Sequence, residues 1–248
     1  MISTRQAHTP PVSTATPRRT LLRAALAGTA ATAGVALAAP SAGAATHPQP
    51  TRPRPTTPDE ALRELAEGNR RWRTFREQHP HETETVRRTL VSGQHPFAIV
   101  LGCVDSRVPP ELAFDQGLGD LLTVRSAGEV LDEAVLGSIS YGVLELGIPL
   151  VLVLGHQSCG AVAAAVKADD TGEELPAHIQ YLADQISPAI DHTQQGDART
   201  DATITANVQR ITERLAAEPD LAAKVAEGKL AIVGARYELT TQLVHRID

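Results

Sequence analysis

Short apolar runs are the feature of this sequence that most restricts its fold. Residues 97–102 and 149–155 are almost wholly apolar, which is typical of strands buried on both faces of a sheet. Shorter runs of the same kind occupy residues 120–124 and 230–234, and segments with helical spacing of apolar residues occupy 135–146 and 204–215. Strands that alternate with helices in this way predict an α/β fold, with a mostly parallel central sheet flanked by helices.

The first 44 residues are predicted to be a signal peptide and not part of that fold. Arg18 and Arg19 precede a run without charge from residue 24 to residue 46, and residues 42–44 supply the small side chains of a cleavage site. The arginine pair resembles a twin-arginine export signal, although Pro17 stands where that signal usually has Ser or Thr. The alternative is an uncleaved membrane anchor, for which the threonines and glycines of the run are poorly suited.

The remaining chain divides into a Pro-rich linker, residues 45–57, and a single domain, residues 58–248. Prolines prevent the linker from forming a helix. Thr57 then begins a helix, because it can cap the first turn, Pro58 follows at the first helical position and Glu60 completes a capping box. A polar loop is predicted at 191–201. We expect the processed protein to be exported by the twin-arginine route, secreted or held in the cell envelope, with no stable membrane span.

The charge balance excludes one class of partner. The chain has a net charge of −6, and residues 1–44 carry four arginines and no acid. The rest therefore has 19 bases against 29 acids, a balance of −10. Nucleic acids require a basic surface, so we expect no nucleic-acid partner.

Both cysteines directly follow predicted strands. Cys103 comes after residues 97–102, and His156 and Cys159 come at the end of 149–155. The carboxyl ends of parallel strands lie at one edge of a sheet, where ligands collect. Two thiolates and an imidazole are ligands for tetrahedral zinc, with one position left open. Alternatively, the cysteines are inert buried side chains, or they form the disulfide that an exported chain favours.

Two charged residues follow the first cysteine. On an extended segment Cys103, Asp105 and Arg107 project to one side, because side chains alternate along a strand. The carboxylate would then either pair with the guanidinium or occupy the open position on the metal. Gly160 is expected to begin a helix, and its positive dipole end would favour the thiolate of Cys159.

These residues resemble the motifs of a known family. Residues 103–108 and 155–162 look like the two zinc motifs of the β-class carbonic anhydrases. Further segments resemble parts of that family in the same order, and the resemblance covers roughly residues 58–246. These segments are residues 68–72, 93–96, 119–120, 124–128, 140–142 and 234–237.

The resemblance implies the β-carbonic anhydrase type of fold and a zinc-dependent, reversible hydration of CO2 to bicarbonate and a proton by metal-bound hydroxide. It implies one Zn2+ per subunit with Cys103, His156 and Cys159 as its ligands. Asp105 and Arg107 match the family's catalytic dyad, in which the arginine holds the aspartate off the metal. Asp105 would bind zinc only in a closed state of the site.

The resemblance also implies substrate contacts and an oligomer. Gln94, Gly160 and Tyr141 match substrate-binding positions. In one subclass the glutamine reaches the substrate from the neighbouring subunit, and the tyrosine lies at a dimer interface. We therefore expect a homodimer or a larger homo-oligomer.

Three positions depart from the family pattern. Ser126 and Glu129 stand where the family has Asn, and Leu122 replaces a frequent aromatic residue of the substrate pocket. These changes affect the expected rate and pH profile more than the metal ligands.

Three other functions are compatible with the same residues. A non-catalytic zinc-binding protein on this fold would keep Asp105 as a permanent fourth ligand. A hydrolase of CS2 or COS would use the same site. A thiol redox protein would need Cys103 and Cys159 oxidised.

Overall fold

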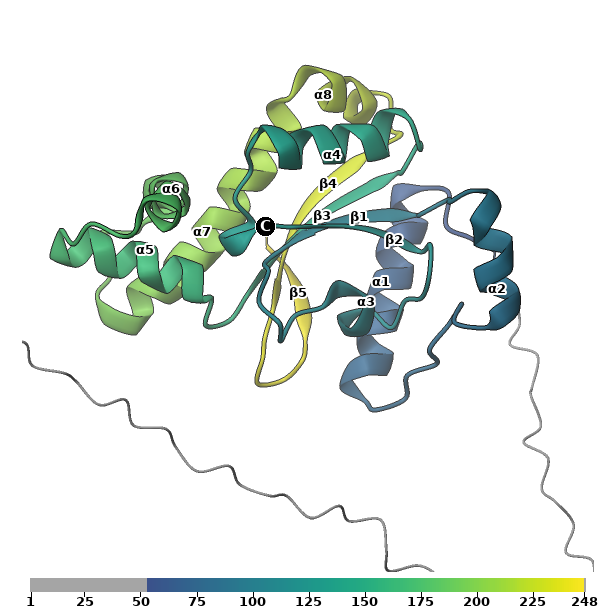
Figure 1. The fold of residues 1–248 in the computed structure, drawn as a ribbon, viewed down its shortest axis with the longest axis horizontal. Helices are drawn as coiled ribbons and strands as arrows, with labels where there is room; N and C mark the ends of the chain where they lie inside the picture. The colour runs from purple at the N-terminus through teal and green to yellow at the C-terminus, as the bar shows by residue number, and fades with distance from the viewer. Residues whose placement is uncertain (1–52, 248) are drawn as a thin grey trace, which may run out of the picture. The chain divides into compact units, whose positions relative to one another are not determined.

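The computed structural model describes residues 53–247, and the predicted signal peptide lies outside them. Their centre is a five-stranded sheet in the order β2-β1-β3-β4-β5 (Figure 1). The first four strands are parallel and β5 is antiparallel to β4. The predicted mostly parallel sheet is thus confirmed. The strands are β1 (Ala98–Gly102), β2 (Leu121–Arg125), β3 (Leu150–His156), β4 (Ala231–Tyr237) and β5 (Val244–Ile247).

Helices cover both faces of the sheet (Figure 1). One face packs against α1 and α3 through side chains such as Leu65, Phe114 and Leu152, and the other packs against α4, α7 and α8 through Ile139 and Leu215. The helices are α1 (Pro58–Arg73), α2 (Glu84–Thr89), α3 (Pro110–Ala113), α4 (Glu133–Leu144), α5 (Gly160–Thr171), α6 (Ala177–Ile186), α7 (Gly196–Ala217) and α8 (Pro219–Ala226), with short 3-10 turns at η1 (Leu90–Ser92), η2 (Ala127–Glu129) and η3 (Ser187–Ala189).

The first helix, α1, begins where the capping pattern predicts. The Thr57 side chain accepts a hydrogen bond from the Glu60 amide, and the Glu60 carboxylate accepts one from the Thr57 amide. Just before this cap, Arg54 donates to the carbonyl of Gly119 at 2.6 Å and to the carboxylate of Asp120 at 2.9 Å. The end of the linker is therefore attached to the domain. No helix within residues 53–247 has both the length and the apolarity needed to cross a bilayer.

The strand order predicts where a ligand site can form. From β1 the chain crosses to β2 on one side of it and then to β3 on the other. Neighbouring parallel strands whose connections leave in opposite directions open a crevice at their carboxyl ends, which is where ligands bind in open α/β sheets. Cys103 and His156 both lie at this point.

Two segments differ from expectation. Residues 196–201 belong to α7, so the predicted polar loop is correct only for 191–195. The first turns of α7 have no apolar stripe in the sequence, and polar contacts hold them in place instead. Arg199 donates to the carbonyl of Gln194 at 2.8 Å and pairs with Asp170 of α5. Strand β5 is too short and too polar to stand out in the sequence.

Substitution of two glycines tests how tightly α1 is packed. A Cβ at Gly68 would overlap the backbone carbonyl of Phe114, whereas one at Gly137 in α4 would meet nothing within 4 Å. We expect Gly68→Ala to lower the free energy of unfolding by about 1–3 kcal/mol or more, because backbone must move. Gly137→Ala should raise it by about 0.5–1 kcal/mol through helix propensity.

Urea denaturation of the two variants beside the parent protein measures both effects. Equal stability of the parent and Gly68→Ala would show that α1 does not pack on α3 in this way.

Candidate metal centre

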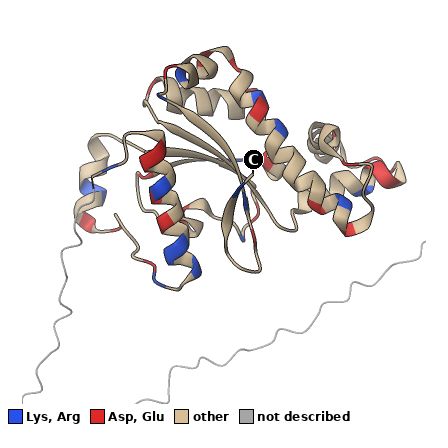
Figure 2. Ribbon diagram, turned by 180° about the vertical axis from the view of Figure 1, so that it is seen from behind, with Lys and Arg blue, Asp and Glu red and all other residues tan. Residues whose placement is uncertain are grey.

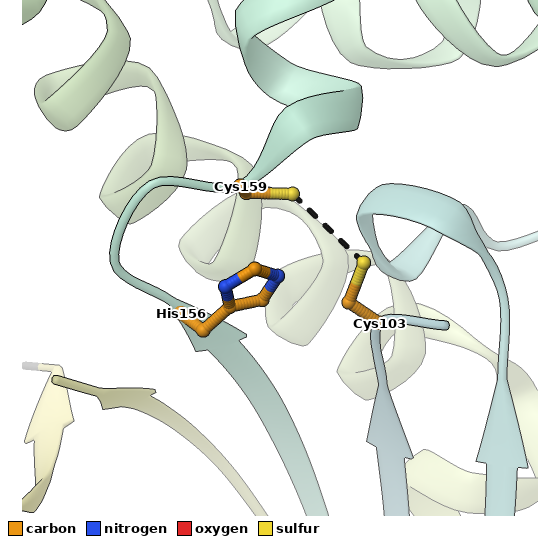
Figure 3. A group of neighbouring side chains, drawn as sticks. All are labelled: Cys103, His156 and Cys159. Atoms are coloured by element: carbon orange, nitrogen blue, oxygen red, sulfur yellow. Dashed lines mark hydrogen bonds between the residues drawn. The ribbon is translucent and has the colours of Figure 1, made fainter. Parts of the chain in front are cut away.

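Three side chains from two adjacent loops converge at the sheet edge. Cys103 directly follows β1, His156 ends β3, and Cys159 immediately precedes α5 at its N-cap position. Their possible ligand atoms all lie within 4.8 Å of one another, and the residues are 3%, 0% and 1% exposed, respectively. Figure 3 shows the sulfur of Cys103 and that of Cys159 pointing toward each other beside the imidazole ring. Within residues 53–247 this is the one group of three such side chains with metal-binding spacing.

The imidazole is oriented for a ligand. His156 Nδ1 lies 2.9 Å from the carbonyl oxygen of Gln157, which can only accept, so Nδ1 carries the proton. The other ring nitrogen, Nε2, is buried and has no hydrogen-bond partner. Leaving a buried polar atom unpaired costs about 1–3 kcal/mol, and a bound metal ion removes that cost. The donor set and this lone pair both fit zinc.

The two thiols are free and lie close together. Cys103 Sγ and Cys159 Sγ are 3.9 Å apart, and the Gly128 amide donates to Cys103 Sγ at 3.4 Å. The hydrogen bond between the thiols, helped by the nearby His156 and the Gly128 amide, lowers the pKa of Cys103. The same contact, together with burial, raises the pKa of Cys159. Two sulfurs this close together, beside an imidazole, form the kind of soft donor set that binds zinc.

Asp105 and Arg107 meet through a turn and not through strand alternation. The chain leaves the extended conformation after Cys103, and the Val108 amide donates to the Asp105 carbonyl at 3.1 Å. The prediction of an extended segment is therefore wrong beyond this point. The turn occurs because the Asp105 carboxylate accepts from the backbone amide of Arg107 at 2.9 Å.

The turn produces a bidentate ion pair. Arg107 Nε and Nη2 donate to the two carboxylate oxygens of Asp105 at 2.9 and 2.7 Å. These bonds lower the pKa of Asp105 to about 2. Asp105 Oδ2 lies 4.0 Å from His156 Nε2, at the rim of the thiol and imidazole group. Arg107 Nη2 also donates to the Ser158 carbonyl at 3.2 Å, which ties together the loops after β1 and β3.

Sequence reasoning missed the contribution of the strand beside β1. Arg125, at the end of β2, donates to the carbonyls of Cys103 and Asp105 at 2.8 and 2.7 Å. Asn207 of α7 donates to the Gly128 carbonyl at 2.8 Å and so holds the loop whose amide reaches Cys103. Arg125 directly follows a predicted strand, and this position was the feature of the sequence that could have indicated its contact with the loop after β1.

The departures from the family pattern occupy different environments. Ser126 Oγ donates to the Val130 carbonyl at 2.7 Å, which closes the turn after β2. Leu122 is half-buried and packs on the α4 side of the sheet. Glu129 is 1% exposed, has a φ of 54°, and its Oε1 has no hydrogen-bond partner. Burial and the nearby Cys103 raise the pKa of Glu129 well above its usual value.

The other predicted site residues lie on the surface of the chain. Gln94 is exposed between η1 and β1, Tyr141 of α4 is 51% exposed, and Gly160 is the first residue of α5. Within the described part of the chain, no hydrogen bond joins Gln94 or Tyr141 to the three clustered side chains. Their roles in substrate binding stay predictions.

Comparison with known proteins decides the family. Residues 98–244 match the family model of carbonic anhydrase. The chain belongs to the carbonic anhydrase family. Carbonic anhydrase 2 of Mycobacterium tuberculosis is 42% identical over 184 residues, which are 73% of this chain and 89% of that protein. A carbonic anhydrase of Mycolicibacterium smegmatis is 41% identical with the same coverage.

Solved structures place this carbonic anhydrase in the β-class fold. The β-carbonic anhydrase of Coccomyxa in complex with acetazolamide has a TM-score of 0.60 and 26% identity, covering 75% of this chain and 86% of its own. A tetrameric β-carbonic anhydrase from Sordaria macrospora has a TM-score of 0.61, with 19% identity, 75% coverage of this chain and 96% of its own.

The geometry predicts a stoichiometric metal site. Purified protein should bind one Zn2+ per chain, and Cys159→Ser should lose most of it because one of the two sulfur ligands is gone. Ser158→Ala, which changes an exposed neighbour, should retain the metal. Elemental analysis together with a thiol titration measures both. Zinc-free parent protein without titratable thiols would instead indicate the disulfide.

Proposed function

We propose that this carbonic anhydrase catalyses the zinc-dependent, reversible hydration of CO2 to bicarbonate and a proton. The observation that carries the proposal is the buried Nε2 of His156, without a partner and beside the thiols of Cys103 and Cys159. A zinc ion held by these three residues, one per subunit, would supply the Lewis acid that makes water nucleophilic near neutral pH.

In this proposal Asp105 orients the reacting water and Arg107 positions Asp105. The carboxylate remains ionised at any pH near neutrality, because its pKa is lowered to about 2. It is therefore a weak base that accepts a hydrogen bond without removing the proton. Arg107 occupies both carboxylate oxygens. Such an arrangement disfavours a closed site with Asp105 as a permanent ligand, so the non-catalytic alternative is not favoured.

The oligomeric state is part of the same proposal. We infer a homodimer or a larger homo-oligomer, in which Gln94 and Tyr141 take part in substrate binding across subunits. Their exposure in the single chain supports this, as does the tetrameric form of the Sordaria relative. Gly160 would contact substrate from the start of α5, where a Cβ would meet nothing within 4 Å.

Asp105→Asn tests the catalytic dyad. The amide keeps the size of the side chain but loses the charge that binds Arg107, so the orientation of the water should be lost. We expect CO2 hydration, measured by stopped flow, to fall by at least about tenfold while zinc content and folding are retained. Asp184→Asn, on the exposed side of α6, is the matched control and should be fully active. Full activity of Asp105→Asn would exclude the residue from the reaction.

We further propose that residues 1–44 direct export by the twin-arginine route and are then removed. Replacing Arg18 and Arg19 by Lys should keep the protein inside the cell, because that route depends on the arginine pair. Arg5→Lys leaves the pair intact and should not affect export. Cell fractionation and N-terminal sequencing of the exported form measure both. Export that continues unchanged without the pair would point to the general secretory route or to an anchor.

A further inference from the structure

A cavity lies away from the metal centre, between α1 and the β4–β5 edge of the sheet. Its volume is about 460 Å³, within the range of sites that bind small organic ligands. Buried apolar side chains, Leu65, Phe114 and Leu152, form its floor, and Leu62 and Val244 line its walls. None of the residues that line it belongs to the metal centre. We call this cavity the arginine groove, after the residues at its rim.

Four arginines surround this apolar floor. Arg63, Arg70 and Arg73 come from α1 and Arg246 comes from β5, and all four are exposed. Among the residues that the structure describes, none of the four forms an ion pair, whereas Arg107 and other arginines of the domain do. Asp59 is the one acidic residue in the lining. Figure 2 shows the blue bands along α1, most of them toward its C-terminal end.

This concentration of positive charge is not a consequence of composition or of helix electrostatics alone. Outside residues 1–44 the chain carries more acids than bases. Basic residues are favoured in the last turn of a helix by its dipole, which accounts for Arg70 and Arg73. The dipole does not account for Arg63, in the middle of α1, or for Arg246 on a different element.

The groove is also rigidly built. Asn69 of α1 donates from Nδ2 to the Gln242 carbonyl at 2.9 Å, and its Oδ1 accepts from the Val244 amide at 2.9 Å. Asn69 is 4% exposed, so these bonds are protected from water. They hold the β4–β5 hairpin against α1 and so place the backbone of Arg246 at the same groove as the arginines of the helix. A preformed site loses less entropy on binding than a flexible one.

We propose that the arginine groove binds a small amphiphilic organic anion. A carboxylate or sulfonate head would lie among the guanidiniums, whose planar donors match such groups, and an apolar body would pack against the half-buried Leu62, Leu243 and Val244. An inorganic anion would contact the arginines alone, and a neutral apolar molecule would contact only the half-buried apolar side chains Leu62, Leu243 and Val244. The class of ligand therefore follows from charge and apolar surface together.

Fluorescence titration with 8-anilinonaphthalene-1-sulfonate tests the charge. The zinc-loaded chain without its signal peptide should bind the probe at one saturable site, and decanoate should displace it. The double variant Arg70→Gln/Arg73→Gln should bind about tenfold more weakly, because charge-assisted contacts are lost. Arg87→Gln/Arg88→Gln, on the exposed helix α2, is the matched control and should bind like the parent.

Ala66→Trp tests the cavity without changing charge. Ala66 is exposed and lines the groove, so the larger ring should fill it and abolish probe binding in a folded protein. The proposal is overturned if both groove variants bind the probe like the parent, or if 1-decanol displaces it as well as decanoate. It is equally overturned if decanoate does not compete and the arginines instead bind phosphatidylglycerol vesicles. CO2 hydration should be unchanged in the groove variants, which separates this test from that of the proposed function.

Discussion

Parallel pairing of β1 with β3 is the constraint on which the site depends. The two strands are hydrogen-bonded neighbours in register, from Ile99 beside Val151 to Gly102 beside Leu154, so both end at the same edge of the sheet. Each is buried along its whole length, as is typical of the central strands of a parallel sheet. The ligands are thus positioned by the core and not by their own interactions.

Two arginines also hold the loops of the site in place, through hydrogen bonds to backbone carbonyls. Arg125 holds the carbonyls of Cys103 and Asp105, and Arg107 joins the Asp105 carboxylate to the carbonyl of Ser158. The two guanidiniums connect the ends of β1, β2 and β3 through backbone carbonyls and the Asp105 carboxylate. Substitution of either arginine would therefore move the loop geometry and the charge together, which is why Lys is not an equivalent residue at such positions.

Sequence patterns predicted the parts of this protein that repeat along the chain or follow a strand. The apolar runs located β1 and β3, and Cys103, His156 and Cys159 followed from their ends. The proximity of Asp105 and Arg107 was predicted, but the turn that pairs them was not, because side-chain to backbone bonds override alternation. The arginine groove was not predicted at all. Arg63 and Arg246 lie far apart in the sequence, and contacts such as those of Asn69 with Gln242 and Val244 bring their elements together.

Charge balance connects the buried Glu129 to the metal centre. Two thiolates would compensate a divalent ion, and Arg107 already compensates Asp105, so the site is neutral without a further charge. An ionised Glu129 would add a negative charge beside Cys103 in a place with no hydrogen-bond partner for Oε1. Burial of an unpaired charge is costly, so burial favours the protonated carboxyl and raises its pKa. An acid at this position thus fits the site best as a neutral carboxyl, the form that is closest to the amide of the family pattern.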